Sequence, residues 1–490
     1  MRSFRRVSIM VGTAALGAGL LAVVTVPSAL AADTCGDTYT WTGAVDTQWA
    51  EPANWTVRGV TATNPPGMTA AVSVPSGERA PVLSASADDQ APTELCTLSL
   101  GVGGTLTISG FLSVDGPTTV GAGARLSIGT AFYASGELSL GSGSVITSTA
   151  ADSEGALSIS AGIALTGNAT LSDIGVGVDA NRQIATAGHT LTLTRGGVMV
   201  FGPGDSITST RAGGSLLATN VGGVALMGNA SIGTGASLKI ADDGVLATAR
   251  SLVGAGATTV TLGGGGALNW AGGSITGAIT LANPLRATVV GSGKHVLLDT
   301  GTGKTRLTNK SAHFVLAAGS LVEHDANTAF RNAGTVTQSG GSLVAYSASA
   351  PSFANAAGAR WTITARAGRT ISVKGSLANS GVLTVPAGVK LKVAGTFKQA
   401  SAGRLALKIG GTKAGKHAAV AAGKLSLGGK LQLQSVTSYR PKAGVKINAI
   451  VKGSSRHGKF KAISSKTYRK HTKWTVAYTT KAVTAKLIKK

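Results

Sequence analysis

The sequence predicts an all-β protein that folds as a right-handed parallel β-helix with an N-terminal cap and a small basic β-rich C-terminal module. Short runs of alternating apolar and polar residues are separated by turns rich in glycine, which accounts for 70 of the 490 residues. Aromatic residues make up only 4% of the chain, which suits a narrow interior. Alternation with a period of two is typical of half-buried strands, and a longer repeat of about 20 to 24 residues is typical of one solenoid coil.

The N-terminus has the three parts of a secretory signal peptide. A basic start precedes an apolar run over residues 7–26, and Ala29 and Ala31 form a small-x-small cleavage site. We therefore expect residues 1–31 to be removed and the mature chain to be secreted or extracellular, in association with the cell wall. The run is also about long enough to anchor the chain in a bilayer. Pro27 and the cleavage site favour the signal peptide, and we expect no membrane span after cleavage.

Residues 32–96 are expected to form the N-terminal cap. The only two cysteines are Cys35 and Cys96, and an isolated pair in an exported protein favours a disulfide over a metal or redox site. Closing this loop stabilises a fold by about 4 kcal/mol in the chain-entropy model. Three tryptophans in the segment are candidates for a sugar-binding platform, but burial over the open end of the helix is the interpretation we favour. They are Trp41, Trp49 and Trp55.

Residues 97–400 are expected to form the coils. Between residues 307 and 403 a bulky apolar residue stands two positions before an amide, with steps of 23, 23, 24 and 20 residues. We expect the asparagines of this pattern to stack at one corner and exchange side-chain hydrogen bonds between coils. Such a ladder serves turns and is not expected to bind a ligand. Its members are Asn309, Asn332, Asn355 and Asn379.

Two stretches resemble known families. The pattern Trp41-Thr-Gly43, followed by Trp49 and Asn54-Trp55, is similar to the opening cap of bacterial surface β-helix proteins. Residues 403–460 resemble the terminal part of autotransporter passenger domains, which are pectin-lyase-like parallel β-helices. This resemblance implies that residues 401–490 cap the helix and assist its folding outside the cell. An autotransporter continues into a membrane barrel, so we expect a passenger-like protein without a translocator barrel.

Charge is distributed unevenly along the chain. Residues 32–325 hold 13 Lys and Arg and 20 Asp and Glu, whereas residues 326–490 hold 29 Lys and Arg and no acid. Basic residues mixed with aromatic ones near the C-terminus are typical of a polyanion-binding surface, with a solvated face as the alternative. For an exported protein the expected partner is an anionic cell-wall polymer or acidic polysaccharide, without specific nucleic-acid binding. The expected contact residues are Arg456, Lys459, Lys461, Lys466, Arg469, Lys470 and Lys473.

The alternative function is a pectate-lyase-like polysaccharide lyase or a glycoside hydrolase acting on an acidic glycan. Such enzymes need several carboxylates on one outer face, to bind Ca²⁺ or to act as acid and base. The histidines lack a metal-binding spacing, and no nucleophile elbow or phosphate-binding loop occurs, so we expect no metal or cofactor. Acids beside glycines are ordinary in turns, which makes the best acidic group a weak candidate. That group is Asp152, Glu154, Asp173 and Asp179.

A third interpretation is a regular hydroxyl face that binds ice or another crystal surface. The run Thr190-Leu-Thr192-Leu-Thr194 has the required alternation, but in the sequence such runs do not recur at the coil period. The leading hypothesis is therefore a non-enzymatic, adhesin-like surface or matrix protein that its basic C-terminal region holds to an anionic polymer. The oligomeric state stays open.

Overall fold

The computed structural model describes residues 35–77, 79–84, 93–150, 155–248, 259–291, 294–298, 305–317, 321–324, 328–345, 353–467 and 471–490. The expected signal peptide, residues 1–31, lies outside this part of the chain. So do four of the candidate site residues, which are Asp152, Glu154, Arg469 and Lys470. The chain divides into two compact units, residues 1–239 with 243–255 and residues 240–242 with 256–490, and each is described by itself.

The predicted fold class is confirmed, because the chain is an all-β parallel solenoid of about 14 turns in all. The segment Pro52–Asn54, a single turn of 3-10 helix, is the one helical element among the described residues. Coils in the middle of the solenoid have three strands, and each strand pairs in parallel with the strand three places later. A coil therefore has three faces, and strand alternation points every second side chain into the core.

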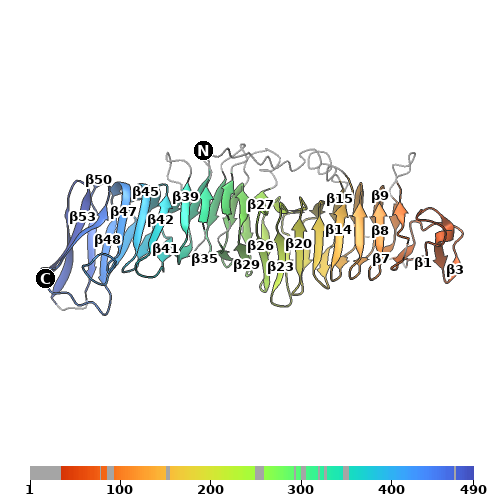
Figure 1. Ribbon diagram of the computed structural model, residues 1–490, viewed down its shortest axis with the longest axis horizontal. Helices are drawn as coiled ribbons and strands as arrows, with labels where there is room; N and C mark the ends of the chain where they lie inside the picture. The colour runs from red at the N-terminus through yellow and green to blue at the C-terminus, as the bar shows by residue number, and fades with distance from the viewer. Residues whose placement is uncertain are drawn as a thin grey trace. The chain divides into compact units, whose positions relative to one another are not determined.

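The first unit is coloured red to yellow-green in Figure 1, where its strands stack coil upon coil. Its elements are β1 (Thr38–Trp41), η1 (Pro52–Asn54), β2 (Trp55–Val57), β3 (Val60–Thr61), β4 (Ala71–Val74), β5 (Val82–Leu83), β6 (Thr93–Leu95), β7 (Thr97–Leu100), β8 (Thr105–Ile108), β9 (Phe111–Val114), β10 (Thr118–Val120), β11 (Arg125–Ile128), β12 (Ala131–Ala134), β13 (Leu138–Leu140), β14 (Ser144–Ser148), β15 (Ala156–Ile159), β16 (Gly162–Leu165), β17 (Ala169–Ser172), β18 (Gly175–Val178), β19 (Gln183–Ala185), β20 (Thr190–Thr194), β21 (Val198–Phe201), β22 (Ser206–Thr208), β23 (Gly214–Ala218), β24 (Gly223–Leu226), β25 (Ala230–Ile232), β26 (Ala236–Ile240) and β27 (Val245–Thr248).

The start of the first unit is closed by aromatic side chains and a covalent bond. The three tryptophans expected in the cap are at most 3% exposed, and the rings of Trp41 and Trp49 contact that of Trp55 edge to face, with centroids 4.9 and 4.7 Å away. The expected disulfide is confirmed, since Cys35 and Cys96 are bonded across 61 residues of sequence. The indoles are therefore core residues and do not form an exposed platform.

The second unit is coloured green to blue in Figure 1. Its strands are β28 (Thr259–Gly263), β29 (Ala267–Trp270), β30 (Gly273–Thr276), β31 (Ala278–Leu281), β32 (Arg286–Val289), β33 (Lys294–Leu298), β34 (Arg306–Asn309), β35 (His313–Leu316), β36 (Leu321–His324), β37 (Ala329–Asn332), β38 (Thr335–Gln338), β39 (Ser342–Ala345), β40 (Phe353–Asn355), β41 (Arg360–Ile363), β42 (Thr370–Lys374), β43 (Leu377–Asn379), β44 (Val382–Val385), β45 (Lys390–Gln399), β46 (Arg404–Ile409), β47 (Ala419–Leu427), β48 (Lys430–Ser435), β49 (Lys446–Lys452), β50 (Ser455–Gly458), β51 (Ala462–Lys466), β52 (Thr472–Tyr478) and β53 (Ala482–Lys489).

Parallel pairing in the second unit continues past residue 400, where the sequence suggested that a separate module begins. Strands β44, β46, β48 and β51 form one uninterrupted parallel row. The pairing becomes antiparallel only at β53, which joins β49 on one side and β52 on the other. Trp474 of this hairpin is 2% exposed and donates its Nε1 hydrogen to Ser435 Oγ at 3.2 Å. The hairpin therefore packs onto the last coils through a buried indole.

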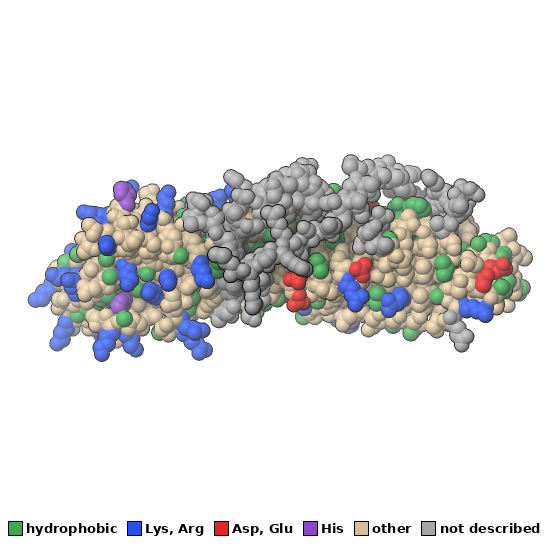
Figure 2. Space-filling view, turned by 45° about the horizontal axis from the view of Figure 1, so that its top comes forward, with side chains coloured by type: hydrophobic (Ala, Val, Ile, Leu, Met, Phe, Trp, Pro, Cys, Tyr) green, Lys and Arg blue, Asp and Glu red, His purple; other side chains and the backbone are tan. Residues whose placement is uncertain are grey.

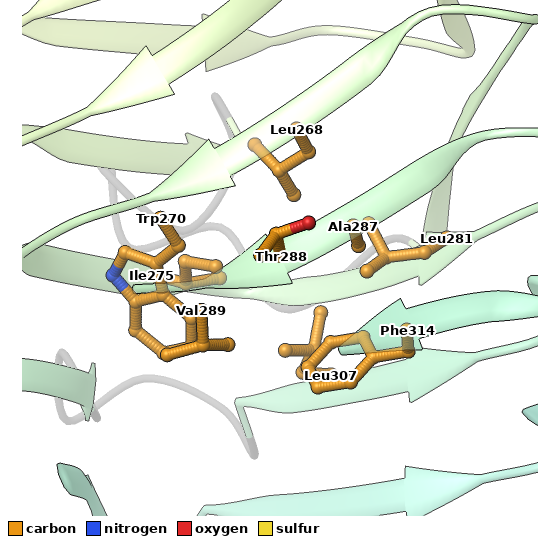
Figure 3. Close-up of a pocket in the computed structure, with 9 residues that line it drawn as sticks. All are labelled: Leu268, Trp270, Ile275, Leu281, Ala287, Thr288, Val289, Leu307 and Phe314. Atoms are coloured by element: carbon orange, nitrogen blue, oxygen red, sulfur yellow. The ribbon is translucent and has the colours of Figure 1, made fainter. Parts of the chain in front are cut away.

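The apolar members of the repeat between residues 307 and 403 stack inside the second unit. Leu307, Phe330, Phe353, Leu377 and Phe397 are partners in consecutive coils, and each is at most 5% exposed. Packing leaves an apolar void of about 10 Å³ beside Trp270 and Phe314, shown in Figure 3. A void of this size is too small for an organic ligand.

Candidate functional site

Strands β41, β44, β46 and β48 form one basic outer face of the second unit. Their register aligns Arg360, Val382, Arg404 and Lys430 in one column across four coils. The three cations are exposed, while the neighbouring Leu and Trp side chains on the same strands point inward. Adjacent parallel strands lie about 4.8 Å apart, so the backbones of Arg404 and Lys430 are separated by that distance. The column is a row of outward cations interrupted once by valine.

A second column of short or uncharged side chains runs beside the first, two residues further along each strand. Most of its members are half-buried, and none is charged, aromatic or branched aliphatic. The register from β38 to β51 aligns Thr337, Thr362, Thr384, Ala406, Gln432 and Ser464.

A third column, two residues further again, returns to basic side chains in the last coils. It contains Lys408, Gln434 and Lys466. We call the three columns together the basic track. On β46 the cations Arg404 and Lys408 border the short Ala406 on both sides, and in the other coils of the track a cation stands on at most one side. Because residues 326–490 contain no Asp or Glu, no carboxylate side chain of these coils neutralises the track. Figure 2 shows the Lys and Arg side chains spread over this part of the second unit.

The contact residues expected from the sequence are distributed over several strands. Arg456 lies on β50, which pairs with β47, whereas Lys466 lies on β51, which pairs with β48 in the other sheet. Lys461 precedes β51, and Lys473 is an exposed residue of β52. Only Lys466 of the expected group belongs to the basic track.

Arg456 is partly engaged in holding the chain together. Its Nε donates to Thr479 O at 2.7 Å, its Nη1 donates to Gly458 O, and its Cζ lies 5.2 Å from the ring centroid of Tyr478. Lys459 Nζ lies 5.8 Å from the same centroid. Burial raises the pKa of Tyr478, although its Oη accepts the Phe460 N–H at 3.2 Å and Arg456 lies nearby. This cluster is a cation–π contact that fixes a loop. The Nε and Nη1 groups of Arg456 already donate to backbone carbonyls and are therefore not open to a ligand.

The asparagines of the repeat form a continuous buried ladder in the second unit. Asn309 Nδ2 donates to Asn332 Oδ1 at 2.9 Å, and the same bond links Asn332 to Asn355 at 2.8 Å and Asn355 to Asn379 at 2.7 Å. Gln399, which the sequence pattern also contains, accepts the last of these bonds at 2.9 Å. Each Nδ2 donates a second bond to a backbone carbonyl of the next coil. The ladder is at most 2% exposed, so it carries buried hydrogen bonds without any charge.

The described acids of the candidate catalytic group do not converge. Asp173 precedes β18 and Asp179 follows it, so the two carboxylates lie at opposite ends of one strand. Asp173 Oδ2 accepts the Ser172 hydroxyl at 2.8 Å, and Asp179 is exposed. Within the described ranges no group of three or more His, Cys, Asp or Glu side chains is placed to hold a metal ion.

Asp205 is the acid with the most perturbed environment, and the sequence did not single it out. It is 1% exposed and accepts the Arg182 N–H at 2.9 Å and the Gly202 N–H at 2.8 Å. Burial raises the pKa of Asp205 from 3.8 to about 6, with a smaller contribution from Asp179, and the two backbone bonds oppose this rise. The carboxylate closes a turn between coils, and the Asp-Ser pair before a strand was its only signal in the sequence.

The first unit carries one column of hydroxyl residues. The register aligns a Thr or Ser in five consecutive coils, although Thr-x-Thr runs do not recur in all of them, because Arg125 and Val145 stand where the other hydroxyl of the run would be. The steps of 20, 20, 25 and 22 residues are unequal because the loops differ in length, and this hides the period. The column contains Thr107, Ser127, Thr147, Ser172 and Thr194.

The sequence matches no protein-family model, and no curated protein sequence is significantly similar to it. Within the part of the chain that the structure describes, no helix has the length and apolar character needed to cross a bilayer. The function is therefore inferred from the outer faces alone.

Proposed function

We propose that this chain is a non-enzymatic, exported surface or matrix protein whose second unit binds an anionic polymer of the cell wall or an acidic polysaccharide. The observation that carries the proposal is the basic track, in which exposed cations stack at coil spacing in a region without a single acid. A linear polyanion presents many negative charges in series. Several weak contacts with such a polymer add to a firm attachment.

The internal chemistry of the second unit supports the same proposal. Buried hydrogen bonds between coils are made by the neutral amides of Asn309, Asn332, Asn355, Asn379 and Gln399. Because these bonds involve no carboxylate, the surface Lys and Arg side chains of these coils are not needed to neutralise a buried acid. Arg360, Arg404 and Lys430 are exposed and are therefore available to an external anion.

Asp173 and Asp179 do not form a carboxylate pair of the kind that catalysis needs. A lyase or glycosidase needs carboxylates on the same face within reach of one glycosidic bond, and strand β18 lies between these two. A cleavage assay on uronate polymers, with and without Ca²⁺, checks this. We expect no shortening of the polymer, and rapid shortening would favour the lyase or hydrolase.

The proposal is tested by retention of the full chain on immobilised polygalacturonate and on an uncharged polysaccharide of similar length. We expect retention on the anionic polymer alone, with release as NaCl rises to about 0.5 M, because exposed charges more than a few ångströms apart are screened at that ionic strength. Retention that persists unchanged through about 1 M NaCl contradicts an electrostatic attachment.

A further inference from the structure

We propose that the basic track takes one extended chain of a linear anionic polysaccharide, laid across strands β38 to β51 so that its anionic groups meet the cation columns. This inference rests on the proposed polymer binding and names the face, the orientation and the class of polymer. Apart from Lys466, its cations are ones that the sequence did not propose as contact residues, chiefly Arg360, Arg404 and Lys430.

The spacing of the columns favours a single chain. Residues two apart in a strand lie about 6.6 Å apart on the same face, so the two cation columns are separated by about 13 Å. On β46 this pattern is complete within five residues, with Arg404 and Lys408 on either side of Ala406. The short central side chains leave room for one polymer chain between the longer cationic ones. A diffuse polycationic tail would have no reason to keep a central column free of Lys and Arg over six coils.

The side-chain chemistry of the track favours a glycan. Arg guanidinium groups bind carboxylates with two parallel hydrogen bonds, and each Thr hydroxyl both donates and accepts. The central column therefore offers partners for sugar hydroxyls between the charged columns, at Thr337, Thr362 and Thr384. Single-stranded nucleic acid is bound mainly by aromatic stacking, and the track residues include no aromatic side chain. Polymers whose anions sit on a hydroxyl-rich backbone are thus the best match.

The orientation follows from the solenoid itself. Arg404 and Lys430 come from adjacent coils, so a polymer that meets both advances by about 4.8 Å along the stacking direction. A chain laid parallel to the strands would meet the cations of only one coil, for example Arg404 and Lys408 of β46. Affinity is therefore expected to rise with polymer length until the chain spans β41 to β51, and then to level off.

The experiment compares two variants of the full chain that lose the same charge. The track variant is R360Q/R404Q/K430Q, and the matched control is K374Q/K392Q/K398Q, which removes three exposed lysines from β42 and β45. Binding of polygalacturonate of defined length is measured by calorimetry at fixed low salt. We expect the dissociation constant to rise about tenfold or more in the track variant and about twofold in the control, since removal of contacting charges has more effect than a change of net charge.

A third variant separates hydroxyl contacts from charge. T362V/T384V keeps shape and charge, and we expect it to weaken polygalacturonate binding several-fold while binding of inorganic polyphosphate, which has no hydroxyl groups along its chain, is unchanged. Unchanged far-UV circular dichroism and melting temperature show that each variant is folded. These substitutions change outward side chains and leave the core residues in place.

The outcomes distinguish this inference from the proposed function. If wild-type protein binds polygalacturonate and both charge variants weaken it equally, the track is overturned and general polyanion binding stands. If T362V/T384V weakens binding of both polymers equally, the glycan assignment is overturned. Tighter binding of single-stranded DNA than of polygalacturonate also overturns it. If wild-type protein binds no polyanion at low salt, the proposed function itself is wrong.

Discussion

The two units build the same coil with different polar chemistry. In the first unit, the buried turn at Asp205 is closed by a carboxylate that accepts two backbone N–H groups. In the second, a run of neutral amides from Asn309 to Gln399 makes the equivalent bonds between coils. Amides satisfy buried donors and acceptors without bringing a charge out of water. The comparison shows how residues 326–490 can contain no acid and still form buried side-chain hydrogen bonds between coils.

The outer faces of the two units also differ in the polar and charged side chains that they carry. The corresponding face of both units carries a column of hydroxyl residues, with Thr107 and Thr147 in the first and Thr362 and Thr384 in the second. In the second unit the flank of that column at β41, β44 and β46 is Arg360, Val382 and Arg404, whereas in the first its flank at β8, β11 and β14 is Thr105, Arg125 and Val145. Flanking columns can therefore change the ligand class of a face without altering the coil.

The largest effect is expected from removing the Cys35–Cys96 disulfide, which only the first unit has. Replacing Cys35 and Cys96 with serine should lower the stability of the first coils by about 4 kcal/mol, because the unfolded chain regains the entropy of a long open loop. Hydrogen exchange measured by mass spectrometry should show faster exchange at β1, β4 and β7 and unchanged exchange in the second unit. Reduced wild-type protein is the control. Equal acceleration in both units would contradict a staple that acts locally.

The next effect tests the amide ladder of the second unit. Asn355→Ala should lower the stability of the surrounding coils by about 3 kcal/mol, because it leaves buried polar partners unsatisfied. Asn332 Nδ2 loses its side-chain acceptor, and Asn379 Oδ1 loses its side-chain donor. The urea midpoint of the second unit reports the change, with the outward Thr337→Ala as control. A loss below about 1 kcal/mol would show that the ladder adds little to backbone pairing.

The third prediction concerns pH in the first unit. The folded pKa of Asp205 is about 6 against an ordinary value of 3.8, so the folded state retains a proton that the unfolded state has lost between these values. The unfolding free energy of this unit should therefore fall as pH rises from about 4 to about 6, by about 2 kcal/mol, and change little above pH 7.

Asp205→Asn provides the control for that pH dependence. This variant should lose the contribution of Asp205 to the pH slope, whatever its effect on stability at a single pH. Urea unfolding monitored at the first unit between pH 4 and 8 measures both proteins. A slope that is identical in the two would assign the pH dependence to other groups.

The smallest effect is expected when a cation column like that of the second unit is built on the outer face of the first unit. The substitutions T105R/V145R/T170R, beside the existing Arg125, give the first unit a cation column of four coils. In a protein that already lacks Arg360, Arg404 and Lys430, this graft should restore polygalacturonate affinity several-fold. Calorimetry checks it, and arginines placed at three scattered outward sites of the first unit are the control. Equal recovery in both would show that charge alone, without alignment, determines binding.

Much of this fold could be predicted from residue patterns. Alternation predicts the strands, and the even spacing of Phe330 and Phe353, with Asn332 and Asn355, predicts the stacked interior and its amide ladder. Coil register elsewhere could not be predicted, because loop lengths vary. The step from Val260 to Ile279 is 19 residues and the step from Ile279 to Leu307 is 28.

The basic track depends on that register and was therefore missed. Arg360 and Arg404 are 44 residues apart with a valine between them in the column, so no local motif connects them. The sequence instead drew attention to the densest basic segment, around Arg456 to Lys473. The useful signal was a cation at the first position of several alternating runs, and it becomes visible only when the runs are aligned coil by coil.

The amide ladder also has a direction. Each asparagine Nδ2 from Asn309 to Asn379 donates to the amide oxygen of the next coil, so these side-chain dipoles are aligned head to tail as far as Gln399. Such alignment polarises each bond and adds the partial charges at the two ends, as in an α-helix. The positive end is the Nε2 of Gln399, which is buried and has no partner among the described residues. A row of uncharged side chains thus directs positive potential toward the coils that carry the most lysine and arginine, and an anion approaching them gains from both.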